Sequence, residues 1–472
     1  MDLSTIIKYQ TVYKNTVCST PYINKPVNKL HTYMKDPFRA YDIRGIVGEN
    51  IDKVFAKKLG EVTAQHIDGD TIIVGRDIRP SSQELSEALI QGIKRTGTNV
   101  IDIGEVTTPM VYFAINYWQK AGGIMITASH NPPEYNGFKI CGEHAVPIDE
   151  GNGLKQIHDA FHNYQQQEHK HGNTEKKRVE KAYVDHVITF ADNLKQQKII
   201  MDGGNGAAGL ITEKIFGRTP IEIDPLYLEP NGAFPNHEPN PMIPKNTMDL
   251  RRRVKESSAR AGFAWDGDAD RFFICDEKGV MISPDVFFAY LIDTYNADET
   301  KNVLKNALCG QIVDDVSEKN NVDVHTERVG HGFMKRAMRK YDASLGAEHS
   351  AHYYFKYNFY ADDGMIPAVI AASLISQSNV PLSERIKPYK KYYKSGEKNF
   401  NVDNREAVLK RVEEEYSEEQ KERIDGITVT FKEGWFNIRK SNSEPVVRLN
   451  VEADSEGALQ KILTQAKRHI HA

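Results

Sequence analysis

The stretch TPMVYFAINYWQKAGGIMITASHNPPEYNGFKI, residues 108–140, predicts a helix, a buried strand and a sharp turn, one after another. The apolar run that ends at Ile126 is typical of a buried strand, and the two consecutive prolines that follow prevent both a helix and a continuing strand. Ser129 is therefore predicted to lie just beyond the end of a strand, on a stiff turn that brings Lys139 back within reach. The same pattern would suit an ordinary polar loop, so this stretch alone leaves a reactive serine and a plain turn as alternatives.

The residues before this stretch show the same alternation of strand and helix. TIIVG (71–75) and NVIDIG (99–104) predict buried strands, and SSQELSEALIQGIKRTG (81–97) between them predicts a helix. Strands that are apolar throughout and joined by helices imply a parallel sheet that is covered on both faces. Ser129 would then lie beyond the carboxyl end of a strand, where open α/β sheets place their ligands.

Two further units of this kind follow, and then a segment of different character. KIIMDGGNGAAG, from residue 198, begins a second strand–turn–helix unit, and a third runs from SPDVFFAYLIDTY to IPAVIAASLI. The glycines of the second unit resemble a dinucleotide-binding fingerprint only weakly, because the G-x-G-x-x-G pattern is absent. Near the C-terminus a helical EAVLKRVEEEY precedes alternating segments such as GITVTF, which predicts a small α+β domain with antiparallel strands.

Length, charge and cysteine use narrow the class of protein. The 472 residues predict about three or four domains, and a net charge of −4 provides no global field that would attract nucleic acid or an anionic membrane. The apolar runs are too short to span a bilayer, and the N-terminus lacks the pattern of a secretory signal. The 4 cysteines are widely separated and form no CxxC pair, which is typical of reduced thiols. We therefore expect a cytoplasmic protein with no nucleic-acid partner and no membrane partner.

The segment WDGDADRFFICDEKG (265–279) predicts a divalent cation site. Asp266, Asp268 and Asp270 stand at alternate positions in a turn, and converging carboxylates repel one another unless a cation lies among them. A calcium loop would use the same spacing, but Arg271 stands where such a loop needs glycine. The better interpretation is Mg²⁺ with a phosphate oxygen in its shell and Arg271 close to the same phosphate. A solvated acidic turn is the alternative.

Three other stretches carry polar side chains that are candidates for a binding site. In GAEHSAHYYF (346–355), Glu348, Ser350 and His352 are two residues apart, so an extended backbone would point them the same way, although a polar surface strand has the same spacing. RKSNSEP (439–445) has the composition of an anion cradle, and a plain turn before a proline is the alternative. AYDIRG (40–45), taken by itself, indicates only the end of a strand.

Together these motifs resemble those of the α-D-phosphohexomutases, specifically the phosphomannomutase/phosphoglucomutase branch. FRAYDIRG, TASHNPPEYNGFKI, FPNHEPNP, DGDADR, RVGH, GAEHSAH and RKSNSEP occur in the family's order from Phe38 onward. The resemblance implies an α/β fold of four domains around a central cleft, with three similar mixed α/β units and a smaller α+β C-terminal domain. We place these domains at residues 36–177, 178–280, 281–388 and 389–472, after a poorly ordered extension at 1–35.

The resemblance also implies a reaction. Ser129 matches the serine that carries a phosphoryl group, donates it to a hexose phosphate, and receives the other phosphate back from an enzyme-bound 1,6-bisphosphate that has turned round. The implied function is that of a phosphomannomutase, which interconverts mannose 6-phosphate and mannose 1-phosphate and also acts on glucose phosphates. The implied cofactors are one Mg²⁺ per subunit and glucose or mannose 1,6-bisphosphate as activator. The implied partners are hexose phosphates, bound by a monomer or a dimer.

The residues that match the family's functional positions fall into three groups. The catalytic positions are matched by Arg44, Ser129, His130, Lys139, Arg271 and His352. The substrate-binding positions are matched by Tyr41, Thr326, Arg328, Gly330, His331, Glu348, Ser350, Arg439, Ser441, Asn442, Ser443 and Arg448. The metal ligands are matched by Ser129, Asp266, Asp268 and Asp270. Lys139 or His352 would take the proton from the attacking sugar hydroxyl.

Four positions depart from the family's usual pattern, and several alternatives stay open. Ala269 and Ala351 stand where glycine is usual, Ser443 stands where threonine is common, and a lysine often found near Ser317 is missing. Phosphoglucomutase and phosphoglucosamine mutase are the alternatives within the family. A phosphoserine-type sugar phosphatase would not need a second phosphate site. A catalytically silent sugar-phosphate binder would need neither Ser129 nor the aspartates.

Overall fold

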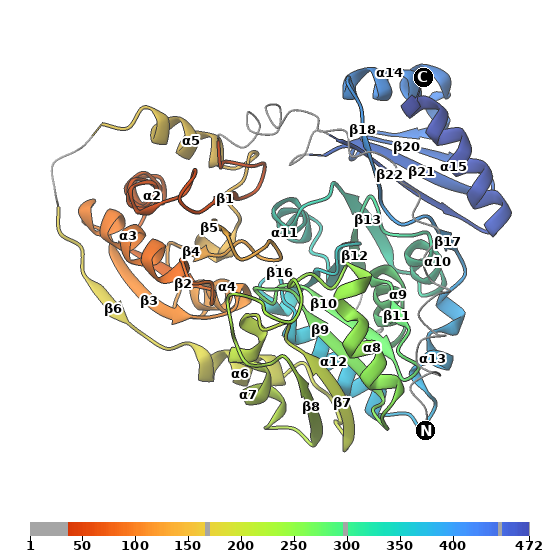
Figure 1. The fold of residues 1–472 in the computed structure, drawn as a ribbon, viewed down its shortest axis with the longest axis horizontal. Helices are drawn as coiled ribbons and strands as arrows, with labels where there is room; N and C mark the ends of the chain where they lie inside the picture. The colour runs from red at the N-terminus through yellow and green to blue at the C-terminus, as the bar shows by residue number, and fades with distance from the viewer. Residues whose placement is uncertain (1–35, 166–169, 296–300, 442–445, 472) are drawn as a thin grey trace, which may run out of the picture. The chain divides into compact units, whose positions relative to one another are not determined.

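The computed structural model describes residues 36–165, 170–295, 301–441 and 446–471 (Figure 1). The extension expected at 1–35 lies outside the described residues. From Pro37 onward the chain belongs to one compact unit, whose described residues contain four β-sheets. None of the described helices is long and apolar enough to cross a membrane.

The first sheet is mixed, with a parallel centre and an antiparallel edge. Its strands are β1 (Ile43–Ile46), β2 (Thr71–Arg76), β3 (Asn99–Glu105), β4 (Gly122–Ile126), β5 (Tyr135–Gly142) and β6 (Thr174–Lys176), in the order β1-β5-β4-β2-β3-β6. The predicted parallel arrangement is confirmed for β2, β3 and β4. Strand β5 pairs antiparallel with β4, because the chain reverses at the sharp turn that contains Ser129.

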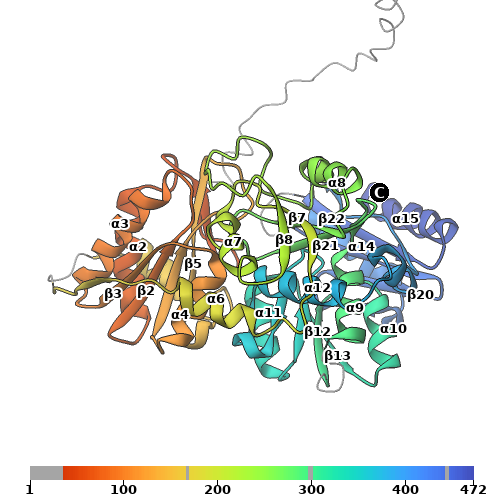
Figure 2. The same ribbon diagram turned by 90° about the horizontal axis from the view of Figure 1, so that it is seen from below.

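Helices cover both faces of this sheet, as its fully apolar strands predict (Figures 1 and 2). The helices are α2 (Lys53–His66), α3 (Ser82–Arg95), α4 (Thr108–Tyr117) and α5 (Leu154–His162). Alternate residues of β2 point to opposite faces: Ile72 packs in one cluster with Leu59 of α2 and Leu89 of α3, and Ile73 packs in another with Met110 of α4. Two hydrophobic clusters therefore hold the sheet from its two sides.

The second and third sheets are also mixed. The second has the order β11-β10-β9-β7-β8, with β7 (Gln197–Asp202), β8 (Ile221–Leu226), β9 (Ala261–Trp265), β10 (Phe272–Asp276) and β11 (Met281–Ile282), and with helices α6 (Glu180–Ile188), α7 (Thr212–Phe216) and α8 (Met248–Lys255). The third has the order β13-β12-β14-β15-β16, with β12 (Asn302–Asn306), β13 (Asp323–Glu327), β14 (Leu345–Ala347), β15 (Tyr353–Phe355) and β16 (Ala361–Asp362). Its helices are α9 (Pro284–Thr294), α10 (Ile312–Lys319), α11 (His331–Lys340), α12 (Met365–Ser376) and α13 (Leu382–Arg385).

The fourth sheet confirms the small α+β domain that the alternating C-terminal segments predict. Its strands are β17 (Tyr393–Lys394), β18 (Lys398–Asn401), β19 (Lys421–Glu422), β20 (Ile427–Phe431), β21 (Gly434–Lys440) and β22 (Val446–Ala453), and all its pairings are antiparallel. Helices α14 (Arg405–Glu415) and α15 (Glu456–His471) pack on this sheet around Val412, Phe436 and Ile462.

The glycine-rich segment after β7 has a packing role. The N–H of Ala207 donates to the carbonyl of Gly267 at 2.9 Å, and a Cβ on Gly206 would lie 2.9 Å from that same oxygen. The absence of side chains therefore allows this segment to lie directly against the acidic turn. This contact explains why glycine occurs in this segment, and the explanation involves no nucleotide.

Candidate active site

One topological position recurs in the first three sheets and carries the predicted functional residues. In each sheet a strand with a parallel neighbour is followed by a short turn and an antiparallel strand: β4 to β5, β9 to β10, and β14 to β15. The turns contain Ser129, the three aspartates and the Glu348–His352 segment, respectively. Each turn also holds one non-glycine residue at positive φ: Ser129 at 51°, Ala269 at 59° and Ala351 at 71°. L-residues avoid this region, so the backbone is strained at all three turns.

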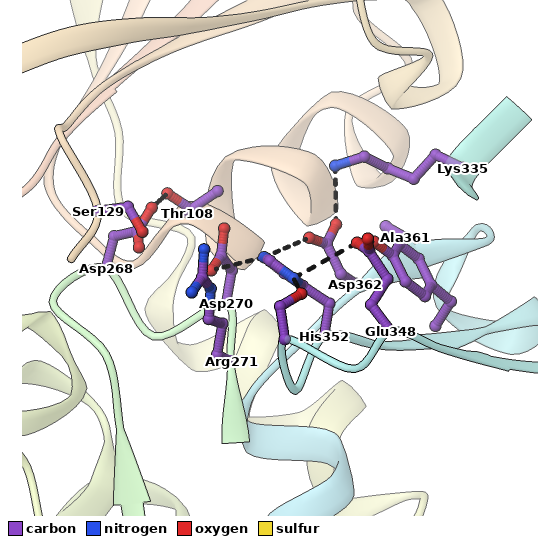
Figure 3. Close-up of polar contacts among 12 residues, drawn as sticks. Thr108, Ser129, Asp268, Asp270, Arg271, Lys335, Glu348, His352, Ala361 and Asp362 are labelled. Atoms are coloured by element: carbon purple, nitrogen blue, oxygen red, sulfur yellow. Dashed lines mark hydrogen bonds and ion pairs between the residues drawn. The ribbon is translucent and has the colours of Figure 1, made fainter. Parts of the chain in front are cut away.

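Backbone contacts join the three turns to one another. The Phe272 N–H donates to the carbonyl of Ala351 at 3.0 Å, which links the second turn to the third. The first and second turns touch at Gly267, where an added Cβ would lie 2.3 Å from the Ser129 carbonyl. Glycine is therefore required at position 267 for this close approach. The structure brings the predicted serine, aspartates and histidine together, and Figure 3 shows Ser129, Asp268, Asp270 and His352 of this group.

Ser129 is buried, with 2% of its surface exposed, and its hydroxyl points at the acidic turn. Its Oγ donates to Asp266 Oδ2 at 2.8 Å and lies 3.2 Å from His130 Nδ1. Its N–H donates to Thr127 Oγ1 at 2.8 Å. Burial and the nearby guanidinium groups of Arg271 and Arg44 hold the pKa of His130 well below its usual value, so this ring is a neutral partner for the serine.

Arg79, which the sequence reasoning missed, holds the serine turn from behind. Its guanidinium is buried and donates to the carbonyls of Ser129 (2.8 Å), Asn131 (2.6 Å), Pro132 (2.6 Å) and Tyr135 (3.0 Å), and its Nε donates to Asp77 Oδ2 at 3.0 Å. These five contacts use the planar donor array that only arginine provides. The available signal was its position, because Arg79 follows β2 at the same edge of the sheet at which Ser129 follows β4.

The three aspartates are fully buried and can hold a metal ion. One carboxylate oxygen from each lies within 4.8 Å of those from the others, and none of the three residues is exposed. Lys139 Nζ lies 2.7 Å from Asp268 Oδ2 and also contacts Asp270 Oδ2. Oδ1 of Asp268 has no hydrogen-bond partner among the described residues. A buried, unpaired carboxylate oxygen is costly, and a bound cation would satisfy it.

The carboxylates of this cluster keep Lys139 in its positively charged form. Burial alone would lower the pKa of Lys139, but the carboxylates of Asp268 and Asp270 outweigh burial and hold the pKa well above its usual value. Burial, Asp270 and Asp268 together raise the pKa of Asp266. Although burial alone would raise the pKa of Asp270, the cations Lys139 and His352 hold it well below its usual value. A cation bound among the carboxylates would favour the ionised form of Asp266.

Arg271 and Arg44 border the serine and the aspartates. Arg271 Nε lies 3.5 Å from Asp266 Oδ2, and its backbone pairs with that of His352 in an isolated β-bridge. Arg44 donates to Asn131 Oδ1 at 2.7 Å, in the serine turn, and to Asp42 Oδ2 at 2.5 Å. The Arg44 guanidinium therefore lies against the serine turn, and that of Arg271 lies against the acidic turn.

The expectation that Glu348, Ser350 and His352 share an extended strand is wrong. They form a tight turn, in which the Glu348 N–H donates to the His352 carbonyl at 3.0 Å and Ala351 takes a left-handed conformation. The side chains still converge, because the turn closes on itself: His352 Nδ1 lies 3.0 Å from Ser350 Oγ and 3.5 Å from Glu348 Oε1. His352 Nε2 lies 3.3 Å from Asp270 Oδ1, which joins this turn to the acidic one.

Glu348 is 1% exposed and is held by donors from several elements. Its Oε1 accepts from the Tyr354 hydroxyl at 2.6 Å, and its Oε2 accepts from the Gly330 N–H at 2.9 Å and from Asn306 Nδ2 at 3.1 Å. The contact with Gly330 joins the turn to the residues that precede α11. His331, the first residue of α11, packs edge-on against the Tyr41 ring, with centroids 5.1 Å apart. Both ring nitrogens of His331 are buried without a partner among the described residues.

Thr326 and Arg328 are only partly buried. Thr326 is within β13, and the structure records no side-chain contact from it to the described residues of the acidic turn. Arg328 reaches across to the first domain, where its Nη1 lies 2.9 Å from Glu150 Oε1, and its guanidinium lies 4.1 Å from the Phe333 ring centroid. Ser317 is buried within α10, and its hydroxyl has no partner among the described residues.

The fourth domain presents a pair of arginines held by one carboxylate. Arg439 of β21 and Arg448 of β22 are directly opposite in the sheet register. Glu397, which the sequence reasoning missed, bridges them: Arg439 Nη2 lies 2.9 Å from Oε2 and Arg448 Nη1 lies 3.0 Å from Oε1. Ser441 is buried beside them, whereas Asn442 and Ser443 lie outside the described residues. Asp425 accepts from the Val329 N–H at 3.3 Å, so the arginine pair adjoins the loop before α11.

Comparison with known proteins identifies the class to which this fold and site belong. Residues 35–168, 181–279 and 283–392 match the α/β/α domains I, II and III of phosphoglucomutase/phosphomannomutase, and residues 397–468 match the C-terminal domain of the same family. The chain belongs to the phosphoglucomutase/phosphomannomutase family of phosphohexomutases. This confirms the family and the four-domain fold that the motifs predict.

Relatives of known name match nearly the whole chain. A protein named phosphohexose mutases from Xanthomonas campestris is 38% identical over 436 residues, which cover 91% of this chain and 97% of that protein. The phosphomannomutase of Escherichia coli is 36% identical over 449 residues, with 91% and 97% covered. A solved structure of a phosphoglucomutase/phosphomannomutase family protein from Burkholderia thailandensis is similar with a TM-score of 0.85 and 28% identity, covering 92% of this chain and 96% of that chain.

Proposed function

We propose that this chain is a phosphomannomutase that interconverts mannose 6-phosphate and mannose 1-phosphate and also accepts glucose phosphates. The observation that carries the proposal is the environment of Ser129. Its buried hydroxyl lies 2.8 Å from a cluster of three carboxylates and beside Lys139, Arg44 and Arg271. A serine in such surroundings suits the carriage of a phosphoryl group. The curated relatives named phosphomannomutase support mannose phosphate as the substrate.

The donor set fits the divalent cation that the family implies. Asp266, Asp268 and Asp270, together with an oxygen on Ser129, would hold Mg²⁺, and the unpaired Oδ1 of Asp268 supports this assignment. When bound, Mg²⁺ would neutralise the charge on the phosphoryl group that is transferred. The other roles, which are proton transfer, stabilisation of the transition state and binding of the second phosphate, belong to side chains of the protein.

Transfer from phosphorylated Ser129 is a displacement at phosphorus. A hydroxyl oxygen of the hexose phosphate attacks phosphorus and loses its proton to a base as the new P–O bond forms. The bond to Ser129 Oγ breaks at the same time, and Oγ leaves with the electron pair and takes up a proton. Of the two predicted bases, Lys139 is held protonated by Asp268 and Asp270. Asp270 also raises the pKa of His352 against the effect of burial, so His352 serves as the base in its neutral form. Lys139, Arg271 and Arg44 then provide fixed positive charge for the transition state.

A second phosphate site on the fourth domain would complete the mutase assignment. Arg439 and Arg448 on the fourth domain, with the Ser441 segment, suit the phosphate that is not reacting. A 1,6-bisphosphate intermediate needs both sites, whereas a phosphatase needs only the first. The arginine pair therefore favours a mutase over a sugar phosphatase. Glucose or mannose 1,6-bisphosphate would serve as the activator that phosphorylates Ser129.

The test is turnover of mannose 1-phosphate, glucose 1-phosphate and glucosamine 1-phosphate under one set of conditions, with Mg²⁺ and a trace of 1,6-bisphosphate. We expect 6-phosphate products, phosphate on Ser129 by peptide mass spectrometry, and loss of most activity in Ser129→Ala. Release of inorganic phosphate in place of a 6-phosphate would establish a phosphatase. Phosphate found only on other residues would overturn the role of Ser129, and a preference for glucosamine 1-phosphate would reassign the substrate.

A further inference from the structure

Thr108, the first residue of α4, makes two hydrogen bonds to the central aspartate of the acidic turn. Its Oγ1 donates to Asp268 Oδ2 at 2.6 Å, and its N–H donates to the Asp268 carbonyl at 3.0 Å. Both residues are 0% exposed, and they belong to different domains, 160 residues apart in sequence. Figure 3 shows Thr108 reaching the Asp268 carboxylate beside Ser129.

These bonds determine which carboxylate oxygen of Asp268 is available to bind a ligand. Oδ2 accepts from Thr108 Oγ1 and also from Lys139 Nζ at 2.7 Å. Oδ1 has no partner among the described residues, although it is buried. The carboxylate is therefore turned so that one oxygen is held by the protein and the other is left for a ligand. Of the two donors, Lys139 has a long flexible chain, whereas a β-branched threonine has few rotamers.

The backbone around Thr108 gives the hydroxyl a fixed direction. The first N–H groups of a helix have no partner within the helix, and here the Asp268 carbonyl accepts from one of them. Pro109 follows directly and restricts the backbone of the first turn. Thr108 thus fixes both the main chain and the side chain of Asp268 relative to the domain that carries Ser129.

We propose that Thr108 is a positioning residue for the metal centre: it presents Asp268 Oδ1 to the cation and sets the distance of the acidic turn from Ser129. This inference rests on the proposed function only in assuming that the three aspartates bind a divalent cation. Residues that orient a metal ligand commonly change metal affinity by about 10- to 100-fold when they are altered. A purely structural contact between domains would instead lower the melting temperature and leave the metal dissociation constant unchanged.

The experiment is a titration of the full-length, dephosphorylated protein with Mn²⁺, followed by electron paramagnetic resonance of the free ion. Thr108→Val removes the hydroxyl and keeps the shape and the N–H bond, and Thr108→Ser keeps the hydroxyl. Thr63→Val is the matched control, because Thr63 is a buried threonine of α2 whose hydroxyl has no partner among the described residues. We expect Thr108→Val to raise the Mn²⁺ dissociation constant at least about 10-fold, with Thr108→Ser and Thr63→Val close to wild type.

Activity provides the second readout. The Mg²⁺ concentration for half-maximal turnover of mannose 1-phosphate should rise by the same factor in Thr108→Val, while KM for the sugar at saturating Mg²⁺ stays unchanged. Thr108→Ala serves the same comparison if the valine variant does not fold. Wild-type Mn²⁺ affinity in Thr108→Val or Thr108→Ala, or an equal loss in Thr108→Ser, would overturn the inference. Failure of the wild-type protein to bind Mn²⁺ would instead overturn the metal assignment in the proposed function.

Discussion

Replacement of Lys335 by methionine should destabilise the third domain strongly, because Lys335 and Asp362 form a fully buried ion pair. Lys335 on α11 and Asp362 in β16 are both 0% exposed, and Nζ lies 2.7 Å from Oδ1 (Figure 3). Nζ also lies 3.8 Å from the ring centroid of Tyr112 on α4. Oδ2 of Asp362 lies 3.9 Å from His352 Nε2 and has no hydrogen-bond partner among the described residues. The pair therefore supports both the packing of α11 and the surroundings of the histidine.

The expected magnitude follows from burial. Removal of one partner leaves an uncompensated charge in the interior, which costs about 3–5 kcal/mol in the free energy of unfolding. The double variant Lys335→Met/Asp362→Asn leaves a buried amide in place of a charge, and we expect a cost of only about 1–2 kcal/mol. The two substitutions should therefore be coupled by at least about 2 kcal/mol in a double-mutant cycle.

Urea unfolding followed by circular dichroism measures these values. At an m-value of about 2 kcal/mol per molar urea, Lys335→Met should lower the midpoint by about 1.5–2.5 M. Lys319→Met is the matched control in the same domain, because Lys319 is 66% exposed and lies 2.9 Å from Asp293 Oδ1. Loss of that surface pair should cost less than about 1 kcal/mol. A midpoint for Lys335→Met within about 0.5 M of wild type, or a double variant no more stable than the single one, would refute the reasoning.

Three further predictions concern the site. Asp268→Asn should raise the Mg²⁺ requirement and lower kcat while the circular dichroism spectrum is retained, because a ligand charge is lost from a preformed turn; unchanged metal dependence would remove Asp268 from the site. Mannose 1-phosphate and glucose 1-phosphate should have similar kcat/KM values and galactose 1-phosphate a value lower by about 10⁴, if Glu348 and Ser350 bind the 3- and 4-hydroxyls; a mannose-to-glucose ratio near that size would show that C2 is read directly. Glu397→Gln should strengthen competitive inhibition by inorganic phosphate by about tenfold, because about 1.4 kcal/mol of repulsion is removed beside Arg439; weaker inhibition than in wild type would show that Glu397 chiefly positions the arginines.

The sequence by itself determined the elements and the chemical types at the site. A run of apolar residues followed by two prolines requires a strand and then a turn, so Ser129 could be placed at a strand end from local chemistry alone. The alternate aspartates of the second turn and the alternation of the last domain are local patterns of the same kind. The motifs also identified the family, because each is a short contiguous segment and together they follow one another in the family's order.

Only the tertiary structure decided which atoms face one another. Thr108, Glu397 and the Lys335–Asp362 pair carry no sequence signal for their roles, because their partners are distant in the chain. The Glu348–His352 segment shows the limit of a local rule. A spacing of two residues predicts a common direction only in a strand, whereas here the left-handed conformation of Ala351 closes a turn. The strained φ angles persist because contacts from several elements hold each turn, and such contacts exist only after the domains have folded together.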